Sequence, residues 1–162
     1  MATAPFLLRP PEPGDLGWIV HSHGVLYERE FGWGAPFEGL VADIVGGFAK
    51  NFDAAMEGCW IAERDGTKVG SVLLVKKEPD VAQLRLLLVD PAARGLGIGG
   101  KLVRACTEFA RDVGYQSIVL WTNADLDSAR RIYAAEGYHK VREENHEGFG
   151  VDFIGEYWEM TL

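Results

Sequence analysis

The sequence predicts an α/β fold of the α+β type, in which a mixed central sheet carries helices on both faces. Strand-like and helix-like apolar patterns follow one another as one strand, two helices, three strands, a helix, a strand, a helix and two strands. The dipeptide Asp65-Gly66 indicates a tight hairpin, so this part of the sheet is antiparallel. A glycine-rich loop after Pro91 joins a strand to a helix, as in many phosphate-binding α/β proteins. With 162 residues, 48% of them hydrophobic, we expect a single domain over residues 1–162.

The first third of the chain is predicted to form a short strand and two helices. Residues 6–9 are a strand-like run that ends at a group of prolines. Apolar side chains recur at helical spacing in residues 16–30, and Asp15 suits the N-cap region of this helix. Residues 31–34, Phe-Gly-Trp-Gly, end it. A second helix is predicted over residues 36–52, which begin with proline, a residue that fits the first helical turn.

The middle of the chain is predicted to form three consecutive strands. Residues 59–64 and 68–75 flank the Asp65-Gly66 turn, and both are rich in apolar and β-branched side chains. Residues 77–80 form the next turn, and residues 81–89 form the third strand. This strand ends at Asp90-Pro91, because proline cannot donate a ladder hydrogen bond.

The last third is predicted to alternate helices and strands. A helix follows the glycine loop, with apolar side chains at helical spacing from Leu102 to Val113. A strand is predicted over residues 116–122 and a helix over residues 126–136, with Gly137 at the position that follows a helix C-terminus. Two closing strands are predicted over residues 138–143 and 151–162.

The loop between Val89 and the following helix contains four glycines in the six residues Gly95 to Gly100. The first turn of a helix has unpaired backbone N–H groups and a partial positive charge, and glycines let an anion approach them. This predicts a phosphate site.

Three phosphate-binding motifs compete for these residues. Gly95-x-Gly97-x-x-Gly100 fits a dinucleotide fingerprint, although more than half the chain precedes it. A P-loop is nearly matched, but Leu102 replaces the metal-binding Ser or Thr. The third motif is Arg94-x-x-Gly97-x-Gly99.

The third motif, following Leu88-Val89-Asp90-Pro91, resembles that of the GNAT acyltransferase family. The segment from Ala129 to Tyr138, Ala-Arg-Arg-Ile-Tyr-Ala-Ala-Glu-Gly-Tyr, is similar to a second motif of the same family. A narrower likeness joins Gly14 to Trp18, the Phe31-Gly32-Trp33 segment and the closing Phe149-Gly150 to GNAT domains fused behind MarR-type DNA-binding domains. The sequence shows no winged-helix half, so we expect the acyltransferase half alone.

The resemblance implies a mostly antiparallel sheet of about seven strands and acetyl-CoA as the acyl donor. It implies that the glycine loop binds the pyrophosphate through backbone N–H groups and that the preceding strand pairs with the pantetheine arm. It also implies that Tyr133 protonates the leaving thiolate. The resulting cofactor-binding set is Leu87, Leu88, Val89, Arg94, Gly95, Leu96, Gly97, Ile98, Gly99, Gly100, Asn123 and Tyr133. Asn123 is included because Leu126 stands where the family often has an asparagine.

The general base is less clear, since Trp121 occupies the position where some family members place a glutamate. Four side chains of the first predicted helix are candidates, namely His21, His23, Glu28 and Glu30, and we select His23 and Glu28 as catalytic residues. An aromatic set could enclose the acceptor amine and consists of Trp18, Tyr27, Phe31, Trp33 and Trp121.

Composition excludes several classes of protein. The net charge of −8 argues against a nucleic-acid partner and is compatible with an amine substrate. Neither a membrane-spanning run nor a signal peptide is recognised, and Cys59 and Cys106 fit a reduced cytoplasmic protein. No metal-ligand spacing occurs among the histidines and cysteines.

We therefore expect a cytoplasmic N-acetyltransferase that uses acetyl-CoA and a small-molecule amine, without a metal, a membrane or a nucleic acid, and with a homodimer left open. Three alternatives remain. They are an acetyltransferase of protein lysines or N-termini, an acyl-CoA-binding sensor without turnover, and an NAD-binding module.

Overall fold

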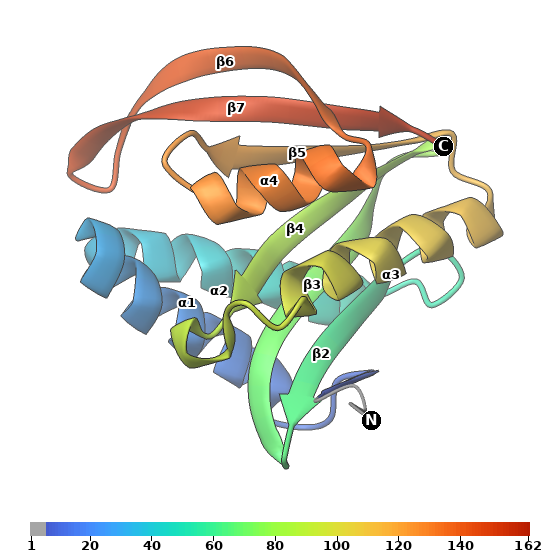
Figure 1. Ribbon diagram of the computed structural model, residues 1–162, viewed down its shortest axis with the longest axis horizontal. Helices are drawn as coiled ribbons and strands as arrows, with labels where there is room; N and C mark the ends of the chain where they lie inside the picture. The colour runs from blue at the N-terminus through green and yellow to red at the C-terminus, as the bar shows by residue number, and fades with distance from the viewer. Residues whose placement is uncertain (1–5) are drawn as a thin grey trace.

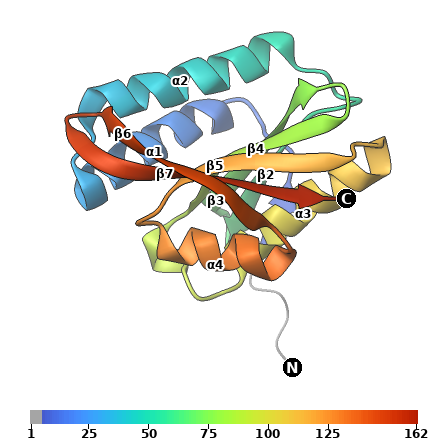
Figure 2. The same cartoon turned by 90° about the horizontal axis from the view of Figure 1, so that it is seen from above.

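The computed structural model describes residues 6–162 and consists of one seven-stranded sheet between two helical layers (Figures 1 and 2). Figure 2 shows helices α1 and α2 on one face of the sheet and α3 and α4 on the other. The elements are β1 (Leu7–Arg9), α1 (Asp15–Phe31), α2 (Gly34–Asn51), β2 (Gly58–Arg64), β3 (Thr67–Glu78), β4 (Val81–Val89), the short 3₁₀ turn η1 (Pro91–Ala93), α3 (Ile98–Val113), β5 (Ser117–Asn123), α4 (Asp127–Glu136), β6 (His139–Gly148) and β7 (Val151–Thr161).

The strands lie in the order β1-β2-β3-β4-β5-β7-β6, and every neighbouring pair is antiparallel except β4 and β5. The parallel pair is possible because α3 crosses between these two strands over one face of the sheet. The predicted fold class is confirmed in its main features: a mixed, mostly antiparallel sheet of seven strands with helices on both faces.

The parallel pair is short, and this feature shapes the rest of the molecule. β4 runs to Val89, but it pairs with β5 only from Val81 to Gln83. Beyond that point the two strands diverge (Figure 1). Leu86 has a positive φ of 57°, and the register with β3 shifts beside it, as in a β-bulge. The second half of β4 therefore has a backbone edge that is not paired with β5.

Each face of the sheet has its own core. One cluster joins α3 and α4 to the sheet and includes the fully buried Leu102 and Cys106. The other joins α1 and α2 to the opposite face and includes the fully buried Ile19 and Val41. The helical periodicity of the sequence predicted these faces correctly, because an amphipathic helix buries its apolar stripe against the sheet.

Several boundaries differ from those predicted, and β3 runs to Glu78, into the residues that were predicted to form the turn before β4. β6 extends to Gly148 because it pairs with β7 through the register Gly148↔Val151, although its polar sequence has no strand-like alternation. α2 begins two residues before Pro36. The N-cap of α1 is Gly14, with φ of 95°, and the Asp15 carboxylate instead pairs with Arg9 at 2.6 Å and Lys68 at 3.4 Å.

Candidate active site

A cavity of about 980 Å³ lies where β4 and β5 diverge. Its lining comes from both faces of the sheet, since it includes side chains of α1 and α2 as well as the glycine loop and the first turns of α3 and α4. The gap between the strands thus connects the two helical layers. A long ligand could enter from the glycine loop and bring one end to the α1–α2 side.

The glycine loop presents an open backbone to this cavity. Gly95 and Gly97 have φ values of 83° and 80°, a region that favours glycine. A methyl group built on Gly95, Gly97 or Gly100 would have no heavy atom within 4 Å. No side chain in the described part of the chain caps α3, so its first N–H groups face free space. These features fit an anion such as a pyrophosphate.

Two residues of the loop, Gly99 and Leu96, contribute to packing between α3, α4 and the core rather than to the open backbone. A methyl group on Gly99 would lie 2.6 Å from Cδ1 of Ile132, so this glycine allows α3 and α4 to approach closely. Leu96 packs against the core beneath α3 and lies outside the cavity lining. Of the predicted loop residues, Arg94, Gly95, Gly97, Ile98, Gly99 and Gly100 line the cavity.

Four cationic side chains surround this end of the cavity, although the chain carries a net charge of −8. Arg94 pairs with Glu30 of α1 at 2.9 Å, and Arg104 pairs with Glu136 of α4 at 3.2 Å. The others are Lys101 and Arg131, both exposed. Their clustering beside the helix N-terminus strengthens its fit to a phosphate-bearing ligand.

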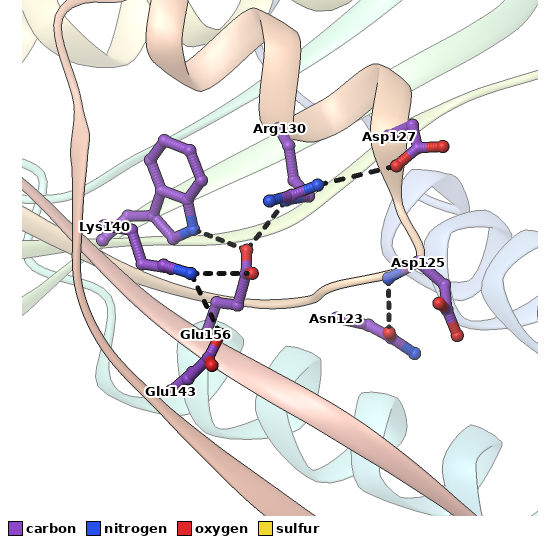
Figure 3. Close-up of polar contacts among 8 residues, drawn as sticks. Asn123, Asp125, Asp127, Arg130, Lys140, Glu143 and Glu156 are labelled. Carbon is purple, nitrogen blue, oxygen red and sulfur yellow. Dashed lines mark hydrogen bonds and ion pairs between the residues drawn. The ribbon is translucent and has the colours of Figure 1, made fainter.

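The predicted strand residues and Asn123 also line the cavity. Leu87, Leu88 and Val89 lie on the part of β4 that is not paired with β5. Asn123 ends β5 and is almost fully buried, and its Oδ1 accepts a hydrogen bond from the Asp125 N–H at 2.8 Å (Figure 3). This bond fixes the turn that leads into α4.

Tyr133 lies on the buried face of α4, is 4% exposed and lines the cavity. Burial raises the pKa of its phenol, so the group keeps its proton at neutral pH. No other group of residues 6–162 forms a hydrogen bond that lowers this pKa. The hydroxyl is therefore available to a ligand.

A buried carboxylate fixes the helix that carries Tyr133. Glu156 of β7 is 2% exposed and accepts hydrogen bonds from Arg130 Nε at 2.9 Å and from Trp158 Nε1 at 3.0 Å. The Lys140 ammonium lies 3.7 Å from its other oxygen. Figure 3 shows Arg130, Lys140 and Glu156 converging from α4, β6 and β7. Arg130 is one helical turn before Tyr133, so this ion cluster holds α4 against the sheet.

Of the two other predicted catalytic residues, His23 lines the cavity and Glu28 does not. His23 lines the cavity and is 1% exposed, but its Nε2 is enclosed and lacks a hydrogen-bond partner within the described chain. Its Nδ1 lies 2.8 Å from the Ile19 carbonyl, which can only accept, so Nδ1 carries the proton. Burial lowers the pKa of His23 to about 4. Glu28 is outside the cavity lining, and its carboxylate accepts the Gly34 N–H at 2.7 Å.

Aromatic side chains enclose the α1–α2 end of the cavity. Of the five predicted, Tyr27, Phe31, Trp33 and Trp121 line it, whereas Trp18 lies outside and stacks under the Lys68 ammonium. Phe149, at the tip of the β6–β7 hairpin, stacks on Trp33 with 5.2 Å between ring centroids. The hairpin tip thus packs on the junction of α1 and α2. Sequence analysis missed this contact, because nothing local in Phe149-Gly150 indicates what the turn touches.

Sequence analysis also missed Arg85, a half-buried cation in the apolar strand β4 that lines the cavity. The signal that could have found it is a single charge within the otherwise uncharged segment Val81 to Val89.

Several other expectations concern absences or reactive groups. Among residues 6–162, no group of three His, Cys, Asp or Glu side chains could hold a metal ion, and none of the helices has the length and apolarity to cross a bilayer. Residues 1–5, which the signal-peptide expectation includes, lie outside the described residues. Cys59 and Cys106 are free and buried, and burial raises the pKa of Cys59 to about 12, so neither resembles an activated nucleophile.

Comparison with known proteins matches residues 24–138 to the acetyltransferase (GNAT) family model. A mouse protein, probable N-acetyltransferase family 8 member 5, is 36% identical over 117 residues, which are 67% of this chain and 52% of the mouse protein. Zebrafish N-acetylaspartate synthetase is 36% identical over 85 residues, which are 52% of this chain and 30% of the zebrafish protein. The chain thus spans about half the length of the first of these relatives and less of the second.

Solved structures share the fold at low sequence identity. An N-acetyltransferase from Staphylococcus aureus superimposes with a TM-score of 0.78 at 16% identity, covering 96% of this chain and 98% of the other. A Salmonella typhimurium protein described as an acetyltransferase, solved with its cofactor acetyl-CoA, gives 0.76 at 16% identity, covering 98% and 94%.

Proposed function

The chain belongs to the acetyltransferase (GNAT) family, and on this premise we propose that it transfers an acetyl group from acetyl-CoA to the primary amine of a small molecule. The observation that carries the proposal is the divergence of β4 from β5 beyond Gln83, in the strand whose end leads into an open glycine loop. It supplies a free strand edge and a phosphate site in series along one cavity. These are the two features that a long, phosphate-bearing thioester requires.

The proposed position of acetyl-CoA follows from this order. The backbone N–H groups from Gly95 to Gly100 would hold the pyrophosphate, and the cations around the loop would add charge. The pantetheine arm, which carries amide groups, would pair with the free edge of β4 from Leu87 to Val89 like an additional strand. Asn123 faces the same cavity from the end of β5.

The chemistry is a direct attack of a neutral amine on the thioester. Acetyl-CoA supplies an acyl carbon that accepts the amine nitrogen and a sulfur that leaves. A backbone N–H at the end of β4 would stabilise the charge on the carbonyl oxygen. The Tyr133 hydroxyl would donate to the departing sulfur as a general acid. Because burial raises its pKa, we propose that it acts chiefly through a hydrogen bond in the transition state rather than by early proton release.

The incoming ammonium must also lose a proton. His23 is the first-helix candidate with a free lone pair in the cavity wall, but that lone pair is enclosed and the low pKa makes the imidazole a weak base. Of the carboxylates considered, Glu30 lines the cavity and Glu28 does not. We therefore propose that the proton passes to solvent at the open mouth of the cavity, with His23 as the alternative to be tested.

The aromatic enclosure of the α1–α2 end favours a small acceptor over a protein segment. Tyr27, Trp33 and Phe37 pack within 5.4 Å of one another by ring centroids, and the hairpin tip covers them. The name of the zebrafish relative, an N-acetylaspartate synthetase, points to a small amine for that protein. A protein amine as acceptor and a sensor role without turnover remain the alternatives. The likeness to MarR-fused domains, a homodimer and a cytoplasmic location remain predictions.

The test combines binding and turnover. Thermal unfolding is recorded with acetyl-CoA, CoA or NAD, followed by release of free CoA thiol against a panel of amines. Stabilisation by both CoA species but not NAD, with thiol release in the presence of one amine class, is expected. Stabilisation without turnover on small amines or peptides would favour the sensor, and an NAD shift alone would refute the proposal.

A further inference from the structure

Arg85 is a cation without a partner in the wall of the cavity. It lies on β4, is half-buried, and within residues 6–162 no carboxylate oxygen lies within 4.0 Å of its side-chain nitrogens. Burial is the cause that lowers the pKa of its guanidinium, and no acidic neighbour offsets it. A cation held partly out of water without an anion is destabilising, so an anionic ligand at this position would be favourable.

The side chain faces the acceptor end of the cavity. Arg85 is opposite Leu73 in the β3–β4 register, and Leu73 belongs to the core on the α1–α2 face. The adjoining lining comes from α2 through Leu40 and Ile44. Arg85 is therefore on the same side of the sheet as the aromatic enclosure.

Its place along β4 separates it from the cofactor. The strand runs from Arg85 through Leu87 to Val89 and then into the glycine loop. At about 3.3 Å per residue, Arg85 is roughly 10 Å from Leu88, in the direction away from the loop. A ligand bound at the loop would reach Leu87 before Arg85, so Arg85 lies in the part of the cavity left to a second substrate.

We propose that Arg85 binds a carboxylate of the acceptor, so that the substrate is a small zwitterionic amine such as an amino acid or an amino-acid derivative. The inference rests on the proposed acetyl transfer and specifies its acceptor. A guanidinium can pair with a carboxylate through two parallel hydrogen bonds, which fixes both the position and the direction of the substrate. The apolar part of such a molecule would lie against the aromatic side chains that line the same cavity.

Two acidic side chains that border the same hollow as Arg85 offer an alternative partner. Asp43 and Glu57 line a second, smaller hollow that Arg85 also borders. Both Glu57 oxygens already accept backbone N–H groups, from Asp53 at 3.1 Å and Lys76 at 2.9 Å. Asp43 is exposed on α2, so Asp43→Asn is the control for a purely structural pairing.

The test compares each amino acid with its α-carboxamide, which keeps the amine and removes the carboxylate charge. Thiol release is measured for both series with the wild type, Arg85→Gln and Asp43→Asn, and calorimetry measures their binding to the CoA-loaded protein. The wild type is expected to prefer at least one amino acid over its amide by about 10- to 100-fold in kcat/KM. Arg85→Gln should lose this preference by raising KM, with unchanged CoA binding and folding, and Asp43→Asn should retain it.

Two results would overturn the inference. One is equal use or binding of every amino acid and its amide by the wild type, and the other is a preference that survives in Arg85→Gln. Carboxylate-dependent binding without turnover would support the site while refuting acetyl transfer. Turnover only of amines that lack a carboxylate would support acetyl transfer while refuting the role of Arg85.

Discussion

The Arg94 guanidinium lies 2.9 Å from the Glu30 carboxylate, and this ion pair joins the glycine loop to the last turn of α1 beside the cavity. A phosphate bound at the loop would compete with Glu30 for Arg94. We expect Arg94→Gln to weaken CoA binding by about tenfold, because one charge-assisted contact is lost. Glu30→Gln should strengthen it by about two- to fivefold, since an exposed pair is weak.

Calorimetry at two salt concentrations checks this prediction. The gain in Glu30→Gln should shrink as salt rises, because salt screens exposed charges. Weaker CoA binding in Glu30→Gln would mean that the pair positions the loop rather than competing with the ligand.

Two neighbouring glycines should respond differently to substitution. Gly100 faces free space, so Gly100→Glu should fold normally but bind CoA at least about 100-fold more weakly, because a negative side chain would enter the proposed phosphate site. Gly99→Ala meets only the Cδ1 end of the Ile132 side chain, at 2.6 Å, and this end can shift at small cost, so the unfolding free energy should change by less than about 1 kcal/mol. Thermal unfolding and CoA titration of both variants separate the two effects. Normal CoA binding by a folded Gly100→Glu protein would refute the phosphate site.

Removing the Tyr133 hydroxyl should affect turnover far more than binding. Tyr133→Phe is expected to lower kcat about 100-fold while the affinity for acetyl-CoA changes little, since we propose that the hydroxyl acts on the departing sulfur. The matched control is Tyr138→Phe, because Tyr138 packs 5.9 Å from the Tyr133 ring but lies outside the cavity lining. Equal kcat values for the two variants would remove the proposed acid role.

His23 should make stability depend on pH. Burial lowers its folded pKa to about 4 from 6.5, so the unfolded chain binds its proton first as the pH falls. The stabilisation from the neutral ring is complete above pH 6.5 and is lost as the pH falls towards 4, by about 3 kcal/mol. Denaturant unfolding between pH 7.5 and 4.5 measures it.

The comparison uses His23→Asn, which keeps a donor near the Ile19 carbonyl, and the exposed His21→Asn as its control. Below pH 6.5, the unfolding free energy of the His23 variant should fall less with decreasing pH than that of the wild type. The control should behave like the wild type. If His23→Asn also removes a low-pH limb from kcat/KM, the imidazole is the general base after all.

The sequence predicted features of the fold that depend on neighbouring residues, and it missed features that depend on distant strands. β4 was predicted from Val81 to Val89 because an apolar run precedes a proline, and both signals are local. The divergence of β4 from β5 was not predicted, because it depends on the positive φ of Leu86 and on a pairing that ends at Gln83. The family resemblance implied only that the end of β4 pairs with the pantetheine arm. β6 was predicted too short because its partner strand, rather than its own polar sequence, determines its length.

In the candidate site, too, local sequence signals were predicted and features that depend on packing were not. Glycines before a helix are a local signal, so the loop was found, but only the packing shows that Gly99 contacts Ile132 whereas Gly100 does not. Glu28 was chosen for its residue type, and the structure uses its carboxylate to hold Gly34. Arg85 was overlooked because a charge in a strand usually faces solvent, and only the neighbouring α2 shows that it borders a cavity.

The last prediction concerns the ion cluster that fixes α4. Glu156 is 2% exposed, and its Oε1 is shared by Arg130 and Trp158. Arg130→Gln removes the closest charge and leaves the carboxylate with Lys140, so we expect a loss of about 2 kcal/mol, less than for a fully buried pair because Arg130 is partly exposed. Asp127→Asn, which removes the exposed partner of the same arginine at 3.6 Å, should change stability by less than about 0.5 kcal/mol.

The same cluster should affect turnover, because Arg130 is one turn before Tyr133. Arg130→Gln should lower kcat while Asp127→Asn does not, and Arg130→Lys should keep part of the kcat that Arg130→Gln loses. Denaturant unfolding and thiol release on the three variants decide between an anchor for Tyr133 and a contribution to stability alone, since the latter would leave kcat unchanged in every folded variant.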